Sequence, residues 1–232
     1  MMSTIIKTEK LCKDYQIGGS HVSVLKEIEI SVEQGEFVSI MGPSGCGKST
    51  LLYLLGGIDH PTTGKVFINH EDLNKMNDKK KSMVRRQSIG FVFQFYNLVQ
   101  NLTVLENILL PVLMDGKKVK DYQQQVEHIL EIVGLTDRQK FTPRELSGGQ
   151  QQRVAIARAL VLNPSLILAD EPIGNLDSQA GEDIMTLFRE INEEKGITIV
   201  QVTHSEASAN MGKRIIHMLD GSIESDDTLV EK

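Results

Sequence analysis

The sequence predicts an α/β fold in which a mainly parallel sheet is covered by helices on both faces and carries an inserted helical segment. Short apolar runs alternate with segments of helical periodicity, which is the pattern of buried parallel strands joined by helices. A glycine-rich stretch, GPSGCGKST at 42–50, stands between one such run and the next helical segment. The stretch 96–161 looks helical throughout and interrupts the alternation.

Composition narrows the class of protein. The chain has 232 residues, of which 40% are hydrophobic and 24% charged, as in ordinary globular proteins. Its net charge of −6 argues against a general nucleic-acid binder, which usually carries a basic surface. Cys12 and Cys46 are expected to be reduced thiols, because no Cys/His cluster has metal-site spacing. No apolar run approaches the roughly 18 residues of a membrane span, so a membrane function would require a partner.

The first elements are predicted strands that lead into the glycine-rich stretch. Apolar residues with period two place Val24, Ile28, Ile30 and Val32 on one strand face, ending at a turn at 34–35. The run 37–41 is typical of a buried strand. A helix is expected after it, with Leu51, Leu52, Leu54 and Leu55 as its apolar residues.

Further strands are expected at 89–93, 166–169, 197–202 and 215–219. Two apolar helical faces lie between them, made by Tyr122, Val126, Ile129, Leu130 and Val133, and by Ile184, Leu187, Phe188 and Ile191. The basic cluster within 79–86 is interpreted as a solvated helix face, and the acidic tail after Ser222 as frayed.

The stretch 42–50 fits the pattern G-x-x-x-x-G-K-[ST] after a strand and before a helix. In that context the backbone N–H groups of 44–49 would surround phosphates, and the helix N-terminus adds its dipole. Lys48 would reach the β- and γ-phosphates, and the Ser49 hydroxyl would ligate Mg²⁺. The alternative is a glycine-rich turn that matches by chance, which the strand–turn–helix context makes less favoured.

Polar side chains follow three predicted strands. Asp170 and Glu171 end LILADE, Gln94 ends IGFVFQ, and His204 ends ITIVQVTH. Because ligands bind outside the carboxyl ends of parallel strands, these side chains are expected to meet at one sheet edge. Asp170 would hold Mg²⁺ through water, and Glu171 would act as general base. Taken alone, each of these residues is equally well explained as an ordinary polar residue at the end of a strand.

A second phosphate-compatible turn occurs at Ser147, in RELSGGQQQRVAIARAL. Ser147-x-x-Gln150 is a capping-box pattern, so a helix is predicted to begin here. Two glycines in its first turn cost about 1 kcal/mol each relative to alanine. They are explained if a ligand must approach the backbone closely, since free N–H groups at a helix N-terminus bind anions. A well-capped helix without a ligand is the alternative.

Together these motifs resemble the nucleotide-binding subunit of ATP-binding-cassette (ABC) transporters, over nearly the whole chain. The resemblance implies a P-loop NTPase core with a mainly parallel sheet, an antiparallel β subdomain and an inserted helical subdomain. It implies one domain over 1–232, with the core and β subdomain in 1–95 and 162–232 and the helical lobe, carrying the signature motif, in 96–161.

The resemblance also implies the site residues. ATP would contact Tyr15, Gly42, Pro43, Ser44, Gly45, Cys46, Gly47, Lys48, Ser49, Thr50, Ser147, Gly149 and Gln150. Glu171, His204 and Gln94 would be catalytic, and Ser49, Gln94 and Asp170 would hold Mg²⁺. Tyr15 matches the aromatic residue that stacks on adenine, although a tyrosine in a strand core is a fair alternative.

In this family two subunits pair head to tail, so that Ser147 of one chain contacts the γ-phosphate bound by the other. A homodimer around two ATP molecules is therefore expected, on the cytoplasmic face of the membrane and attached to a separate permease. The segments FVFQFYNLVQNLTVLENILLP and EPIGNLDS are most similar to the branch for lipoprotein release, macrolide efflux and antimicrobial-peptide export. Ile173 stands where threonine is usual, and Cys46 where serine is common.

Two other functions remain open. One is a regulatory ATPase that controls a membrane protein without transport, and the other is a non-transport ATPase of DNA repair or translation. The latter types resemble fused cassettes or carry long insertions, whereas this chain has one cassette and a short lobe. A GTPase is excluded, because 74–77 (NKMN) lacks the aspartate that recognises guanine.

Overall fold

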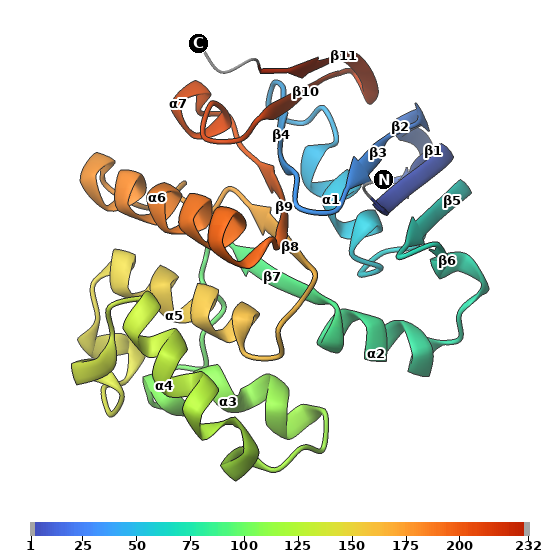
Figure 1. The fold of residues 1–232 in the computed structure, drawn as a ribbon. Helices are drawn as coiled ribbons and strands as arrows, with labels where there is room; N and C mark the ends of the chain where they lie inside the picture. Colours follow the sequence, from blue (N-terminus) through green and yellow to red (C-terminus); the bar gives the residue numbers. More distant parts are fainter. Residues whose placement is uncertain (1–2, 230–232) are drawn as a thin grey trace.

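A computed structural model describes residues 3–229 and contains two sheets with helices packed around them (Figure 1). The strands are β1 (Thr4–Ile17), β2 (Ser20–Ile28), β3 (Ser31–Glu33), β4 (Phe37–Met41), β5 (Thr63–Ile68), β6 (Glu71–Asp72), β7 (Ile89–Phe93), β8 (Leu166–Asp170), β9 (Thr198–Val202), β10 (Arg214–Leu219) and β11 (Ser222–Thr228). The α-helices are α1 (Lys48–Leu55), α2 (Asp78–Gln87), α3 (Val104–Met114), α4 (Gln123–Ile132), α5 (Gly148–Leu160), α6 (Ser178–Lys195) and α7 (Glu206–Ala209). Short 3₁₀ helices occupy Leu73–Lys75, Val119–Tyr122, Thr136–Arg138 and Pro143–Glu145.

The larger sheet has the order β11-β10-β4-β9-β8-β7, and its strands from β10 to β7 are parallel. The predicted strands in this sheet are confirmed to within a residue or two at their ends. Strands β4, β8 and β9 are buried along their whole length, which explains their continuous apolar sequences. Their carboxyl ends meet at one edge, as the predicted site requires.

The smaller sheet is antiparallel and has the order β2-β1-β5-β6, with β3 also paired to β1. Here the prediction of one regular strand face over 24–32 was wrong. The chain leaves the strand at 29–30, and Glu27 has a positive φ of 47°. Ile28, Ile30 and Val32 are buried as predicted, but before the irregularity Leu25 is fully buried and Val24 only partly. Apolar alternation could not reveal this irregularity, because one residue in the left-handed region reverses the faces of those that follow.

Helices cover both faces of the parallel sheet. Ile167 and Ala169 of β8 belong to the core formed with α3 to α6, whereas Leu166 and Leu168 belong to the core formed with α1 and the antiparallel sheet. Helices α1 and α5 thus pack on opposite faces, as Figure 1 shows. The predicted α/β architecture, with its antiparallel β region and inserted helices, is confirmed.

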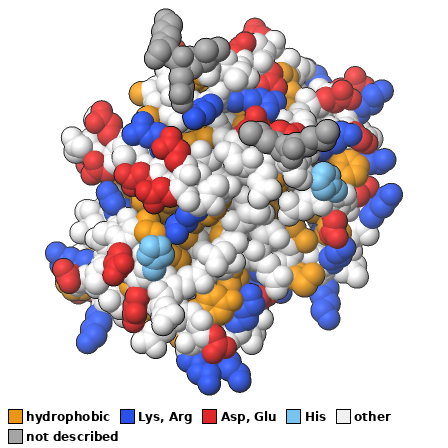
Figure 2. All heavy atoms as spheres, in the orientation of Figure 1, with side chains coloured by type: hydrophobic (Ala, Val, Ile, Leu, Met, Phe, Trp, Pro, Cys, Tyr) orange, Lys and Arg blue, Asp and Glu red, His pale blue; other side chains and the backbone are white. Residues whose placement is uncertain are grey.

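Two surface segments complete the chain. Helix α2 has no buried residue, and Lys79 and Lys80 are exposed as predicted. Arg85 and Arg86 are instead partly buried, bonded to the Gly57 carbonyl and to Asp115. The expectation of a frayed tail after Ser222 was wrong, because β11 pairs with β10 through Asp227 and Thr228. The last part of that tail, 230–232, lies outside the described residues. On the face in Figure 2, basic side chains are scattered among acidic ones.

Candidate nucleotide site

The glycine-rich loop connects β4 to α1 and depends on glycine at two points. Gly42 has φ of 151°, and a Cβ there would overlap the carbonyl oxygen of Met218 in the neighbouring strand β10. Gly47 caps α1 with φ of 102°, and its Cβ would lie 2.8 Å from Leu25 of the antiparallel sheet. The loop is therefore held between the two sheets, with the N-terminus of α1 at its end.

The loop surrounds a cavity of about 240 Å³. Ser44, Gly45, Gly47, Lys48, Ser49 and Thr50 line it, together with Val24 of β2 and Glu171 beyond β8. The ammonium group of Lys48 donates hydrogen bonds to the carbonyl oxygens of Gly42 (2.8 Å) and Pro43 (2.9 Å). Cys46 is buried, and both cysteines are free thiols. N–H groups at a helix N-terminus and a lysine beside one cavity make a site for phosphate.

Oxygen ligands for a cation converge next to this loop. The Ser49 hydroxyl donates to Oδ1 of Asp170 over 2.8 Å, and the Tyr53 hydroxyl donates to Oδ2 over 2.7 Å. Burial, followed by the Asp170 carboxylate, raises the pKa of Tyr53 to about 12, so its phenol remains a donor at neutral pH. A hydroxyl and a carboxylate oxygen are the hard ligands that Mg²⁺ prefers, and the residues present therefore fit this ion.

Glu171 and His204 meet at the same sheet edge. Oε2 of Glu171 lies 3.3 Å from Nδ1 of His204, although the two follow different strands. Glu171 has a positive φ of 45°, and its N–H donates to the carbonyl of Val202. A non-glycine residue in this region is strained by about 1–3 kcal/mol, and such strain is common at functional sites. The carboxylate borders the phosphate cavity, so it can accept a proton there.

Gln94 also reaches this edge, because it follows Phe93, the β-ladder partner of Asp170. Its side chain, however, donates to Oδ1 of Asn175 over 3.3 Å, and Asn175 Nδ2 donates back to the Gln94 carbonyl over 2.9 Å. Within residues 3–229, no hydrogen bond joins the Gln94 side chain to Ser49 or Asp170. The structure thus brings Gln94 to the correct strand end, with its amide bonded to the turn after Glu171.

Tyr15 is 36% exposed and belongs to a small cluster in the antiparallel region. Its hydroxyl donates to Asp59 over 2.7 Å, and the Lys13 ammonium lies 4.6 Å from its ring centroid. Lys13 is also ion-paired to Asp59 at 2.8 Å. Burial and the Asp59 carboxylate raise the pKa of Tyr15, and a hydrogen bond with Thr50 opposes this shift. Tyr15 is therefore anchored beside the phosphate loop rather than placed in a strand core.

Ser147 begins α5 as predicted, and the capping box is confirmed. Its hydroxyl accepts from Gln150 N over 3.3 Å, and its N–H donates to the Gln150 side chain over 3.0 Å. Ser147 is exposed, whereas Gly148 and Gly149 are partly buried. Within residues 3–229, Ser147 does not line the cavity at the phosphate loop of its own chain, and its side chain and N–H are bonded to Gln150.

Sequence reasoning missed three residues that contact the predicted site: Tyr53, Asp59 and Asn175. Tyr53 could have been noticed, since it lies one helical turn after Ser49 and so on the same face of α1. Asn175 and Asp59 carry no such pattern, because their contacts join segments far apart in the sequence.

Comparisons with known proteins agree with this arrangement. The ABC transporter family model matches residues 25–174. The lipoprotein-releasing system ATP-binding protein LolD 1 of Chlorobium chlorochromatii is 43% identical, covering 99% of this chain and 94% of its own. The dimeric post-hydrolysis cassette MJ0796 of Methanocaldococcus jannaschii, bound to ADP and Pi, is 43% identical with a TM-score of 0.90, covering 98% and 100%. Clostridium perfringens cbiO1, part of the transporter complex cbiONQ, is 29% identical with a TM-score of 0.87, covering 97% and 89%.

Within residues 3–229, no helix is both long enough and apolar enough to cross a membrane. The phosphate loop, the strand-end carboxylates and the capped helix α5 occur together in one fold that these cassettes share. The chain belongs to the ABC transporter family and is an ATP-binding, ATP-hydrolysing subunit of such a transporter.

Proposed function

We propose that ATP hydrolysis takes place at the sheet edge where the phosphate loop, Asp170, Glu171 and His204 meet. The observation that carries this proposal is the convergence of two pairs, Ser49 with Asp170 at 2.8 Å and Glu171 with His204 at 3.3 Å. The loop 42–50 binds the phosphates, with Lys48 directed at the β- and γ-phosphates. Tyr15 stacks on the adenine, since its ring is partly exposed and its hydroxyl is anchored.

Mg²⁺ would be held by the Ser49 hydroxyl and, through water, by Asp170, with Gln94 joining once it leaves Asn175. When bound, this ion neutralises charge that develops on the phosphates. Glu171 accepts the proton of the attacking water as general base. His204 lies against the Glu171 carboxylate and orients it while contacting the γ-phosphate. Ser49 and Glu171 line the cavity of about 240 Å³, and Asp170 and His204 are joined to them at 2.8 Å and 3.3 Å.

The signature turn serves the opposite chain of the dimer. Ser147 is exposed at the N-terminus of α5, on the other side of the sheet from the phosphate loop of its own chain. Ser147, Gly149 and Gln150 would therefore contact the γ-phosphate bound by the partner subunit. Residues 1–232 act as one ATPase unit in this arrangement, with 96–161 as the lobe that presents the signature turn.

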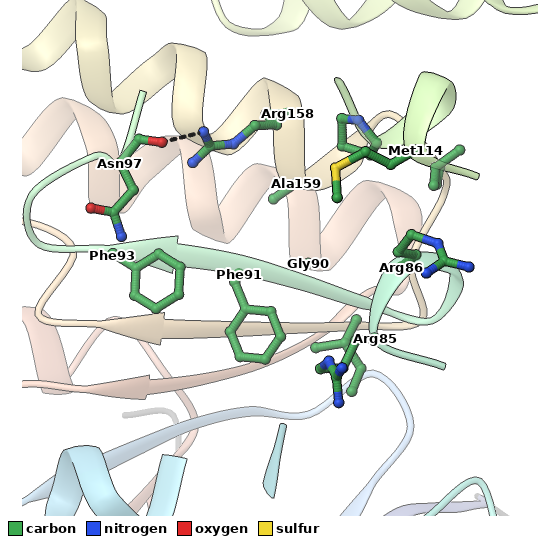
Figure 3. A pocket seen from close by; sticks show the side chains of 12 residues that line it. Arg85, Arg86, Gly90, Phe91, Phe93, Asn97, Met114, Arg158 and Ala159 are labelled. Atoms are coloured by element: carbon green, nitrogen blue, oxygen red, sulfur yellow. Dashed lines mark hydrogen bonds between the residues drawn. The ribbon is translucent and has the colours of Figure 1, made fainter. Parts of the chain in front are cut away.

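The permease docks, in this proposal, at a groove of about 410 Å³ between β7 and the ends of α3 and α5 (Figure 3). Phe91 and Phe93 of β7 line it, with Met114 and Arg86 toward one end of the strand (Figure 3). Apolar side chains are exposed near this groove. Phe95, just after β7, is 73% exposed, and Met114 and Leu113, at the end of α3, are 70% and 56% exposed. A membrane protein is the favoured occupant, because the family supplies that partner and the groove is separate from the phosphate cavity.

We further infer that the chain works at the cytoplasmic face of the membrane in a system of the lipoprotein-release and export branch. The 43% identity to the lipoprotein-releasing relative over nearly the full length supports this choice. The alternative is a regulatory ATPase that controls a membrane protein without moving a substrate. Both need ATP hydrolysis and a membrane partner, so only a transport assay separates them.

The test is to co-purify the chain with its detergent-solubilised permease, identify that permease, and assay the complex in vesicles. ATPase activity should rise on assembly, and labelled cargo should be released or moved only with hydrolysable ATP. Met114→Glu should weaken assembly by at least about tenfold while ATP binding is retained, because a charge would be buried in the contact. Val119→Glu, at an exposed apolar residue elsewhere in the helical region, is the matched control. Hydrolysis without cargo movement would favour the regulatory alternative.

A further inference from the structure

We propose that Tyr53 is a positioning residue for the metal site: its hydroxyl holds one oxygen of the Asp170 carboxylate, so that the other oxygen stays directed at Ser49. This inference rests on the metal-binding roles proposed above for Ser49 and Asp170. Tyr53 lies beyond the glycine-loop motif, which ends at Thr50, and no part of that motif accounts for it.

The first support is the hydrogen-bond geometry at Asp170. Ser49 and Tyr53 lie one turn apart on the same face of α1, and both side chains donate to this carboxylate. Each donor takes a different oxygen, with Ser49 on Oδ1 at 2.8 Å and Tyr53 on Oδ2 at 2.7 Å. Asp170 is only 9% exposed. Two donors from one rigid helix therefore define the plane of a nearly buried carboxylate.

The second support is the packing of the Tyr53 ring. Its centroid lies 6.5 Å from that of Phe93, with the rings tilted by 55°. Phe93 in turn stacks on Phe91 at 5.7 Å with an interplanar angle of 6°. Phe93 is also the ladder partner of Asp170 between β7 and β8. The ring thus packs on β7, the strand paired with the one that carries the carboxylate, so the hydroxyl has a defined position.

The two donors would have different tasks at a metal site. The Ser49 hydroxyl would give an oxygen lone pair to the ion and can keep its O–H directed at Oδ1, since a hydroxyl has one donor and two acceptor lone pairs. Tyr53 would have no ligand role and would only donate to Oδ2, which fixes the orientation in which Oδ1 faces Ser49 and a water on the ion. Groups that orient the ligands of a metal in this way commonly change metal affinity 10–100-fold.

The experiment compares the affinity of the non-hydrolysable analogue AMP-PNP, by calorimetry, in Mg²⁺ and in EDTA. Tyr53→Phe removes the hydroxyl and leaves the ring on Phe93. In EDTA, the affinity of this variant for AMP-PNP should equal that of the wild type. In Mg²⁺, its affinity should be about tenfold lower than that of the wild type. Half-saturating Mg²⁺ for ATPase activity should rise by a similar factor, with kcat largely retained at saturating Mg²⁺. Tyr122→Phe, which removes a hydroxyl in the helical region, should change neither quantity.

Restoring a donor provides a second measurement. Incorporation of p-aminophenylalanine at position 53 places N–H groups where the hydroxyl was and should restore most of the Mg²⁺-dependent gain. The inference is overturned if Tyr53→Phe keeps the full gain, if it loses metal-free affinity equally, or if the amine does not restore the gain. Ser49→Ala separates this from the proposed function: if that variant also keeps the full gain, the metal site itself has been misplaced.

Discussion

Glu171 and His204 are brought together by adjacent strands rather than by proximity in the sequence. β8 and β9 are parallel neighbours, with Asp170 opposite Val202, so the residues just beyond each strand end on the same side. The hydrogen bond from the Glu171 N–H to the Val202 carbonyl holds the Glu171 backbone in its positive-φ conformation. The result is a carboxylate fixed beside both the phosphate cavity and an imidazole.

Glu171→Gln should therefore abolish turnover without abolishing ATP binding. Glutamine has nearly the same shape but accepts no proton, and loss of a general base typically lowers the rate 10²–10⁴-fold. The variant should accumulate as an ATP-bound dimer on gel filtration, and steady-state ATPase assays should give the reduced rate. A variant with nearly wild-type turnover would place the base elsewhere, with His204 as the next candidate.

At the scale of elements, α5 organises the region between the strands β7 and β8. Its N-terminus is capped by Ser147, and its buried Gln152 donates to the carbonyl of Pro172, next to Glu171. Near its other end, the Arg158 guanidinium donates to the carbonyls of Tyr96 (2.8 Å) and Asn97 (2.6 Å), as Figure 3 shows for Asn97. One helix thus contacts the chain after β8 and the chain after β7.

Removing the Arg158 contacts should loosen the segment that follows Gln94. Tyr96 and Asn97 have positive φ values of 60° and 50°, so their backbone depends on outside contacts. Burial lowers the pKa of Arg158, but a guanidinium remains charged at neutral pH. Arg158→Ala should cost about 2–4 kcal/mol of unfolding free energy, because two hydrogen bonds from a charged donor are lost.

Chemical denaturation measures this loss, and hydrogen exchange over 94–98 should accelerate in the same variant. Arg158→Lys should recover only part of the stability, since an ammonium lacks the planar fork that reaches both carbonyls. Arg189→Ala, on the exposed face of α6, is the control and should change stability by less than about 0.5 kcal/mol. Unchanged exchange in Arg158→Ala would mean that other contacts hold this segment.

At the scale of the whole molecule, the two phosphate-compatible helix N-termini belong to opposite faces of one sheet. The start of α1 lies against the antiparallel region, and α5 lies in the helical layer. Ser147 does not line the cavity at the phosphate loop, so a nucleotide bound there would not contact the signature turn of the same chain in this arrangement. In the proposed head-to-tail pairing, each nucleotide would contact one loop and one signature turn, and the solved relative MJ0796 is dimeric.

Mixing two inactive variants tests this pairing. Lys48→Ala damages the phosphate loop, and Ser147→Arg damages the signature turn. In a homodimer of either variant, each of the two ATP sites therefore contains one damaged element. If Ser147 acts on the opposite chain, the mixed dimer contains one intact site and one doubly damaged site. ATPase activity should then partly return on mixing, to at most about half of the wild-type rate for independent sites.

Dimer formation with ATP must be measured in the same mixtures, because turnover that requires both sites would remain low even in a correctly paired dimer. If Ser147 acted within its own chain, every site would retain a lesion, and neither activity nor ATP-dependent pairing would return. An ATP-bound structure with Ser147 far from the γ-phosphate of the opposite chain would also contradict the proposal.

The sequence by itself determined the features that depend on neighbouring residues. The glycine loop followed from a motif between a strand and a helix, and the start of α5 from the Ser147–Gln150 capping pattern. The buried parallel strands followed from continuous apolar runs. These features are local, because backbone conformation and hydrogen bonding over a few residues decide them. Even Glu171 and His204 could be placed at one edge, since strand ends in a parallel sheet share a side.

Only the tertiary structure decided which distant side chains touch. Tyr53 reaches Asp170, Tyr15 is anchored by Asp59, and Gln94 is bonded to Asn175 because strand order and register bring these segments together. The break between β2 and β3 was equally hidden, since one positive-φ residue changes which apolar side chains are buried. Such contacts depend on how elements far apart in the chain pack, and no periodicity within a single element records that packing.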